Sequence, residues 1–231
     1  MIELLDLRQT LDSFASCNDD DEVWARYGWV YASNGGALNA SFWLPASEAE
    51  AFDDDELPTA ARALGLSSFL EPATFADVLD VQKRQRPLST LEDYAAALDY
   101  YAEYDAFLQV PGIDEALGEA SDVEQAAALA MGVGPDIYAS FDVVLAQCPA
   151  QHVKDAARQV AALLAVSIGE ALAACRDLPV CLGEQLDRKR CAGIVAAFDA
   201  FGVPLQVRGY KPFPWSDVPT PAGVVRTVGA A

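Results

Sequence analysis

The chain has 231 residues, of which 52% are hydrophobic, so it can bury a substantial core and is not disordered as a whole. Its 35 acidic and 15 basic residues give a net charge of −20, which disfavours nucleic acid and anionic membranes as partners and favours basic proteins. Apolar runs fall short of the roughly 20 residues that span a bilayer, and residues 1–6 lack the basic start of a signal peptide, so we expect a cytoplasmic protein.

Residues 1–110 are predicted to form a small acidic α+β domain, since 21 acidic and 6 basic residues lie there. Apolar spacing predicts an amphipathic helix over residues 2–16. Aromatic and β-branched residues predict extended segments over 23–32 and 40–44, with Asn34, Gly35 and Gly36 turning the chain between them. The expected result is a short antiparallel sheet.

Two further helices are predicted in this domain, over residues 75–86 and after a cap at Ser89 or Thr90. The spacing of the second helix places Tyr101 and Tyr104 toward the core and Tyr100 outside with Glu103. Residues 105–108 are predicted to form a closing strand.

Two acidic runs, residues 19–22 and residues 53–56, interrupt the domain. Adjacent carboxylates repel one another, which favours a solvated loop over residues 53–56. A calcium-binding loop is the alternative for residues 53–56, but such loops alternate ligands with spacers and place a glycine at the bend. This run does neither, so we expect no metal there.

The second half is predicted to contain a helical linker over residues 111–137, a domain over 138–208 and a proline-rich surface tail over 209–231. The pattern within 138–208 is strand, helix, helix, strand, helix, strand. The whole chain is therefore expected to have a mixed α/β (α+β) fold.

The chain contains five cysteines and one histidine, His152, so few of these side chains could act as a nucleophile, a general base or a metal ligand. The cysteines are odd in number and lack Cys-x-x-Cys spacing, so we expect most of them to be buried thiols. No serine or cysteine stands beside His152 in a recognisable nucleophile motif. The sequence therefore predicts no catalytic residue, no metal and no cofactor.

Several short segments of the predicted second domain carry a resemblance. They are Phe141-Asp142-Val143-Val144-Leu145, Ser167-Ile168-Gly169-Glu170-Ala171, Asp187-Arg188-Lys189-Arg190 and Phe201-Gly202-Val203-Pro204-Leu205-Gln206-Val207. In order and spacing this region resembles the C-terminal domain of the bacterial ribosomal stalk protein. The resemblance implies a β-α-α-β-α-β unit that recruits translation factors. Arg158 keeps basic character on the implied factor-binding face, but a lysine of the family pattern is absent around Gly169.

Four short segments of the first domain carry a second resemblance. They are Asp54-Asp55-Glu56, Leu64-Gly65-Leu66, Asp77-Val78-Leu79-Asp80 and Leu98-Asp99-Tyr100-Tyr101. In these segments the domain resembles a family of small, acidic, uncharacterised bacterial proteins that look like immunity proteins. The resemblance implies a protein that blocks a secreted bacterial toxin by binding it.

These observations predict a non-enzymatic binding protein for a cognate toxin or other basic protein. Carboxylates would steer the partner, and aromatic side chains would anchor it. The alternative is a translation-linked adaptor that binds a ribosome-associated GTPase through residues 138–208. The candidate contact residues are Asp19, Asp20, Asp21, Glu22, Trp24, Trp43, Asp53, Asp54, Asp55, Glu56, Tyr100, Glu103 and Arg158.

Overall fold

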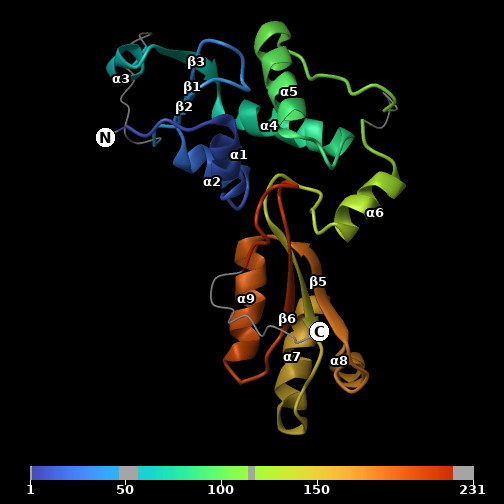
Figure 1. Cartoon of the computed structure of the whole chain (residues 1–231). Coiled ribbons are helices and arrows are strands. Elements are labelled where there is room, and N and C mark those ends of the chain that lie inside the picture. Colours follow the sequence, from blue (N-terminus) through green and yellow to red (C-terminus); the bar gives the residue numbers. More distant parts are fainter. Residues whose placement is uncertain (1, 47–56, 114–117, 221–231) are drawn as a thin grey trace. The chain divides into compact units, whose positions relative to one another are not determined.

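The computed structural model describes residues 2–46, 57–113 and 118–220. Within the described residues the chain forms two compact units, one of residues up to 138 together with 211–217 and the other of residues 139–210 and 218–220 (Figure 1). Each unit combines helices with one three-stranded antiparallel sheet, which confirms the predicted α+β class.

The sheet of the first unit has the strand order β2-β1-β3, and both pairings are antiparallel. Gly35 and Gly36 adopt positive φ angles of 123° and 80° between the first two strands, which confirms the predicted turn. The elements are β1 (Val30–Ser33), β2 (Phe42–Trp43), β3 (Leu66–Leu70), α1 (Leu7–Ala15), α2 (Asp20–Arg26), α3 (Thr59–Ala63), α4 (Pro72–Gln85), α5 (Leu91–Tyr104) and α6 (Asp122–Ala130).

The core of the first unit is aromatic. Phe14 of α1 stacks on Phe75 of α4 with ring centroids 4.6 Å apart, and Phe42 of β2 meets Phe75 edge-on at 6.4 Å. All three side chains are fully buried. Aromatic pairs in these geometries add to the free energy that burial alone supplies, so they fix the two helices against the sheet.

The predicted extended segment over residues 23–32 is wrong in its first half, because α2 occupies Asp20–Arg26. The Asp19 side chain caps this helix by accepting a hydrogen bond from the Glu22 amide at 2.9 Å. Three acidic residues then occupy the first turn, where they complement the positive end of the helix dipole. The acidic run therefore starts a helix.

Other predicted boundaries also change. Helix α1 begins at Leu7, later than predicted, because Asp6 caps it and Leu5 pairs with Phe42 at the sheet edge. Residues 105–108 form no strand, since Asp105 takes a left-handed conformation with φ 51° and ends α5. The helical linker predicted over residues 111–137 contains only the shorter α6 within its described residues, and Ser121 caps this helix. Helix α3 and strand β3 were not predicted.

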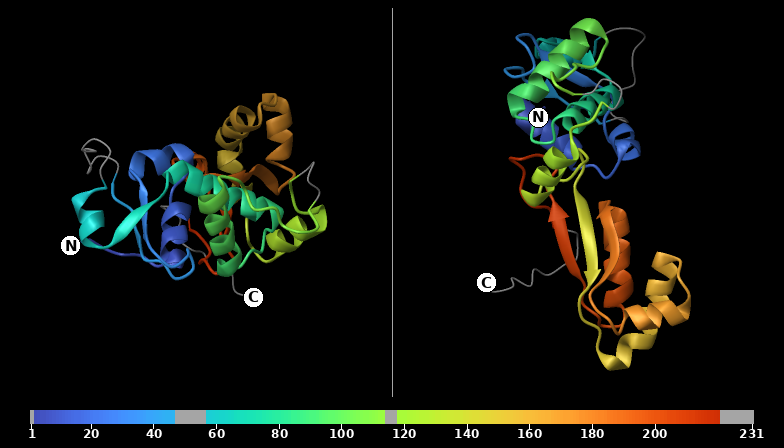
Figure 2. Two further views of the ribbon diagram at one scale, coloured as in Figure 1. Left: turned by 90° about the horizontal axis from the view of Figure 1, so that it is seen from above. Right: turned by 90° about the vertical axis from the view of Figure 1, so that its right-hand side faces the viewer.

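The second unit has the predicted order strand, helix, helix, strand, helix, strand. Its sheet has the order β5-β4-β6, and α7 and α9 pack on one face of it (Figure 2). Phe141, Val143 and Leu145 alternate along β4 and are fully buried against these helices. The elements are β4 (Ser140–Leu145), a short 3-10 helix (Ala150–His152), α7 (Val153–Leu164), α8 (Ile168–Ala174), β5 (Val180–Leu186), α9 (Arg188–Asp199) and β6 (Gln206–Tyr210).

Residues 211–217 were expected in a surface tail, yet they complete the first unit. Phe213 is fully buried and meets Tyr94 of α5 edge-on at 5.2 Å. Lys211 exchanges backbone hydrogen bonds with Gly132 and Gly134 at 2.7 and 2.9 Å. Because Phe213 and Trp215 supply apolar surface to the core, the prolines around them do not keep the segment in solvent.

Candidate partner-binding surface

Four carboxylates line one pocket of about 190 Å³ in the first unit. Asp20 comes from α2, Asp77 and Asp80 from α4, and Asp136 from the segment that follows α6. Ala76, Ile137 and Tyr138 complete the lining. We call this site the acidic pocket. It is wide enough for one side chain of a partner, and its charge suits a cation.

One hydrogen bond positions a carboxylate of the acidic pocket, and two of its carboxyl groups have raised pKa values. The Tyr138 hydroxyl donates to an Asp20 carboxylate oxygen at 2.5 Å, which fixes Asp20 against the wall. Burial and the nearby Asp20 charge raise the pKa of Asp77. Burial also raises the pKa of Asp80, although its ion pair with Arg84 at 2.9 Å acts in the opposite direction. A bound cation would therefore relieve repulsion among the carboxylates.

Lys83, on the same helix as Asp77 and Asp80, is fully buried and contacts the backbone of Asp136, a lining residue of the pocket. Its ammonium donates hydrogen bonds to the backbone carbonyls of Asp136, at 2.6 Å, and of Pro212. Burial lowers the pKa of Lys83 to about 7, against the opposing effect of the Asp136 and Asp80 charges. Because the Lys83 side chain is fully buried, it cannot itself contact a partner.

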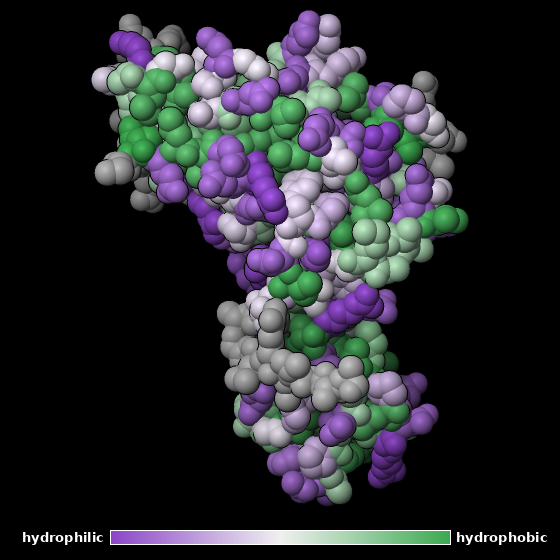
Figure 3. Space-filling view, viewed as in Figure 1, coloured by the Kyte–Doolittle hydropathy of each residue, from purple (hydrophilic) through white to green (hydrophobic). Residues whose placement is uncertain are grey.

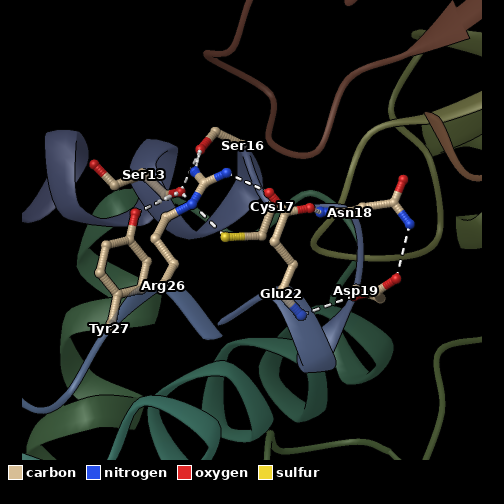
Figure 4. Close-up of polar contacts among 8 residues, drawn as sticks. All are labelled: Ser13, Ser16, Cys17, Asn18, Asp19, Glu22, Arg26 and Tyr27. Carbon is tan, nitrogen blue, oxygen red and sulfur yellow. Dashed lines mark hydrogen bonds and ion pairs between the residues drawn. The ribbon is translucent and has the colours of Figure 1, made fainter. Parts of the chain in front are cut away.

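A second polar network holds α2 in place (Figure 4). The Glu22 carboxylate accepts a hydrogen bond from the backbone N–H of Asn18 at 2.9 Å and forms an ion pair with Arg26. The Arg26 guanidinium also donates to the Ser16 hydroxyl at 2.7 Å. Asp19 caps the helix. In the acidic run of residues 19–22, Asp19 and Glu22 therefore make local hydrogen bonds, whereas Asp20 and Asp21 are exposed.

Trp24 lies one helical turn beyond Asp20 on α2, and 50% of its surface is exposed. Residues four apart share a helix face, so Trp24 lies on the same face of α2 as Asp20, which lines the acidic pocket. Hydrophilic and hydrophobic side chains are interspersed on the face of the first unit that Figure 3 shows. An exposed tryptophan next to charged groups is typical of a protein-binding surface.

The remaining predicted contact residues do not join this pocket. Trp43 is half-buried and stacks on Tyr31 with ring centroids 5.3 Å apart, so it serves the sheet. Arg158 belongs to the second unit and pairs with Asp155 at 2.9 Å. Tyr100 and Glu103 lie on α5. The run of residues 53–56 falls outside the described residues.

Sequence reasoning did not select Asp77, Asp80, Asp136 or Tyr138. The first two stand three residues apart on one helix face, a spacing that could have marked them. The other two come close only through the fold. Within the described ranges, no group of three or more His, Cys, Asp or Glu residues is arranged to hold a metal ion.

Residues 5–110 match the model of a family described as a domain of unknown function (DUF7716). This range includes α2, α4 and α5, and therefore three of the four carboxylates of the acidic pocket. It excludes the entire second unit. No curated protein and no solved structure matches the chain.

No single helix in the described part of the chain is long and apolar enough to cross a membrane. Residues 150–164 and 168–174 reach the required length and composition only as a pair, and a bend of 115° separates them.

Proposed function

We propose that this chain is a non-enzymatic cytoplasmic binding protein that neutralises a basic protein, most specifically an immunity protein against a bacterial toxin. The observation that carries the proposal is the acidic pocket, together with the exposed Trp24 on the helix that supplies Asp20. The pocket offers carboxylates to a lysine or arginine side chain, and the indole offers an anchor that excludes water around the ion pair.

The charge of the first domain supports this role. Its excess of acidic groups attracts a basic partner over several ångströms and raises the rate of encounter. Residues 53–56 would add to that attraction; their contribution stays a prediction. Inhibition by direct binding needs no chemistry from the chain itself.

Co-expression with the product of the adjacent gene tests the proposal. We expect that product to be toxic alone, harmless with this chain and retained by it on an affinity column. Asp20→Asn with Trp24→Ala should reduce both retention and protection, whereas the second-unit variant Glu184→Gln should leave them intact. A neighbour that is harmless alone and is not retained would contradict the proposal.

The second candidate, a translation-linked adaptor, is favoured by one observation in the second unit. Leu163, Leu164, Val166 and Ile168 form an exposed apolar surface where α7 meets α8, with Ile168 51% exposed. Exposed apolar groups at neighbouring positions are typical of a binding surface. Retention of a translation GTPase by the intact chain, and its loss on Ile168→Ser, would support this candidate instead.

A further inference from the structure

A group of aromatic side chains lies at the end of α5: Tyr104 and Phe107 are exposed, whereas Tyr100 and Tyr101 are partly buried and Tyr101 packs against the core. We call Tyr100, Tyr101, Tyr104 and Phe107 the aromatic patch. Tyr104 is 57% exposed and Phe107 46% exposed, although the sequence predicted a core position for Tyr104. The left-handed conformation of Asp105 ends the helix at Tyr104, so the last turn extends past the core.

The rings of the aromatic patch contact one another in two pairs. Tyr100 and Tyr104 have ring centroids 4.7 Å apart, and Tyr101 and Phe107 have centroids 5.2 Å apart. Tyr104 follows Tyr100 by four positions and Tyr101 by three, so the three tyrosines occupy neighbouring positions on the helix surface. The two ring pairs therefore lie at the same end of α5.

Carboxylates surround this patch. A hydrogen bond to Glu103 and the charge of that residue raise the pKa of Tyr104. Partial burial, a hydrogen bond to Asp105 and the charges of Asp105 and Asp77 raise the pKa of Tyr101. Asp77 also lines the acidic pocket, so one carboxylate acts on both surfaces.

The helix end adds to the negative potential. The last turn of α5 contains no basic residue, although a lysine or arginine there would complement the negative end of the helix dipole. The potential therefore suits a cation that comes from another molecule. Aromatic faces also attract cations, and guanidinium groups stack on them well.

We infer that the aromatic patch docks an arginine-bearing apolar segment of a protein partner, with guanidinium groups over the tyrosine rings and between the surrounding carboxylates. The inference rests on the proposed function, because it takes the partner to be basic, and it adds the kind of side chain that is recognised. Rings supply apolar contact area, while Glu103, Asp105 and Asp77 select the charge.

A labelled synthetic peptide of alternating arginine and leucine residues tests the inference, with a glutamate–leucine peptide as the charge control. Fluorescence anisotropy with the full chain gives the Kd. We expect binding of the arginine peptide only. Tyr104→Ala with Phe107→Ala should weaken it roughly tenfold, as the loss of two exposed anchor rings predicts. Tyr104→Phe keeps the ring and should bind as the wild type does.

Leu163→Ala with Ile168→Ala removes exposed apolar groups from the second unit and should leave the Kd unchanged. Circular dichroism confirms that each variant is folded. If the wild type does not bind the arginine peptide, or if Tyr104→Ala with Phe107→Ala leaves its Kd unchanged, the inference is wrong. The toxin role is judged separately, by retention of the adjacent gene product, so either idea can fail alone.

Discussion

The ammonium of Lys83 donates a hydrogen bond to the carbonyl oxygen of Pro212, which lies 129 residues further along the chain. The same ammonium donates to the Asp136 carbonyl at 2.6 Å. Lys83 thus binds α4 to both segments through which the chain leaves and re-enters the first unit. The side chain also lies 5.6 Å from the centroid of the Phe213 ring.

Lys83→Met should destabilise the protein, most strongly in alkaline solution. The substitution leaves two carbonyls without their donor, at a cost of about 1–3 kcal/mol each. The pKa of Lys83 falls from 10.5 in the unfolded chain to about 7 in the folded one. Between these pH values the unfolded chain binds one more proton at Lys83 than the folded chain does. The free energy of unfolding of the wild type therefore increases as pH rises from about 7 to 10.5.

Urea unfolding across this pH range measures the effect. The stability difference between wild type and Lys83→Met should grow between pH 7 and 10.5, by at most about 5 kcal/mol at 1.36 kcal/mol per pKa unit. Titrations of other groups cancel in the comparison. Lys154→Met, which changes an exposed lysine of the second unit, should show no such growth. A difference that stays constant with pH would mean that Lys83 keeps its ordinary pKa.

Phe213→Ala should destabilise the first unit by about 3–5 kcal/mol, the usual cost of removing a buried phenylalanine ring. Phe213 is fully buried and stacks on Trp215 with centroids 5.0 Å apart. Chemical unfolding of the full chain measures the loss. Val218→Ala, at an exposed position nearby, should change stability by less than about 0.5 kcal/mol. Equal effects of the two changes would contradict the packing of residues 211–217 in the core.

Local sequence signals predicted the second unit well and the first unit only in part. Ser167 and Gly202 mark helix ends by capping and by a positive φ of 75°, and both act within a few residues. The extended segment predicted over residues 23–32 was wrong in its first half, because the acidic run at residues 19–22 suits a helix N-terminus and begins α2.

The acidic pocket could not be predicted in full, since its walls come from distant parts of the chain. Asp20 and Tyr138 meet across 118 residues. The burial of Phe213 likewise depends on a return of the chain that no local pattern encodes. Trp24 was predicted as an anchor and is exposed, although its surroundings become visible only in the fold.

Asp77→Asn should raise the melting temperature at neutral pH. Burial and the charge of Asp20 raise the pKa of Asp77 above 3.8, so the folded state holds the proton to higher pH than the unfolded chain does. Stability contributed by this proton is present below 3.8 and is lost as pH rises through the higher folded value. The asparagine of Asp77→Asn carries no charge, so the variant does not lose this stability as pH rises.

Thermal unfolding at acid and neutral pH checks the sign. The advantage of Asp77→Asn over wild type should be greater at pH 7 than near pH 4. Asp217→Asn supplies the control, because it makes the same chemical change at a residue that does not line the acidic pocket. A lower melting temperature for Asp77→Asn at pH 7 would show that Asp77 makes a favourable contact that outweighs repulsion.

Charge and anchor should act on different rate constants when the partner binds. Asp20→Asn with Asp21→Asn and Asp77→Asn should lower the association rate by roughly tenfold at low salt, because steering charges act on the encounter and are screened beyond about 10 Å at 0.1 M salt. Trp24→Ala should mainly raise the dissociation rate, since a buried anchor is lost only after docking. Surface plasmon resonance over a salt series separates the two constants.

Glu184→Gln with Asp199→Asn, which neutralises exposed acids of the second unit, should leave both constants near wild type. If the triple variant keeps the wild-type association rate and its salt dependence, the acidic pocket does not steer the partner, and the contact has to be sought first at the aromatic patch.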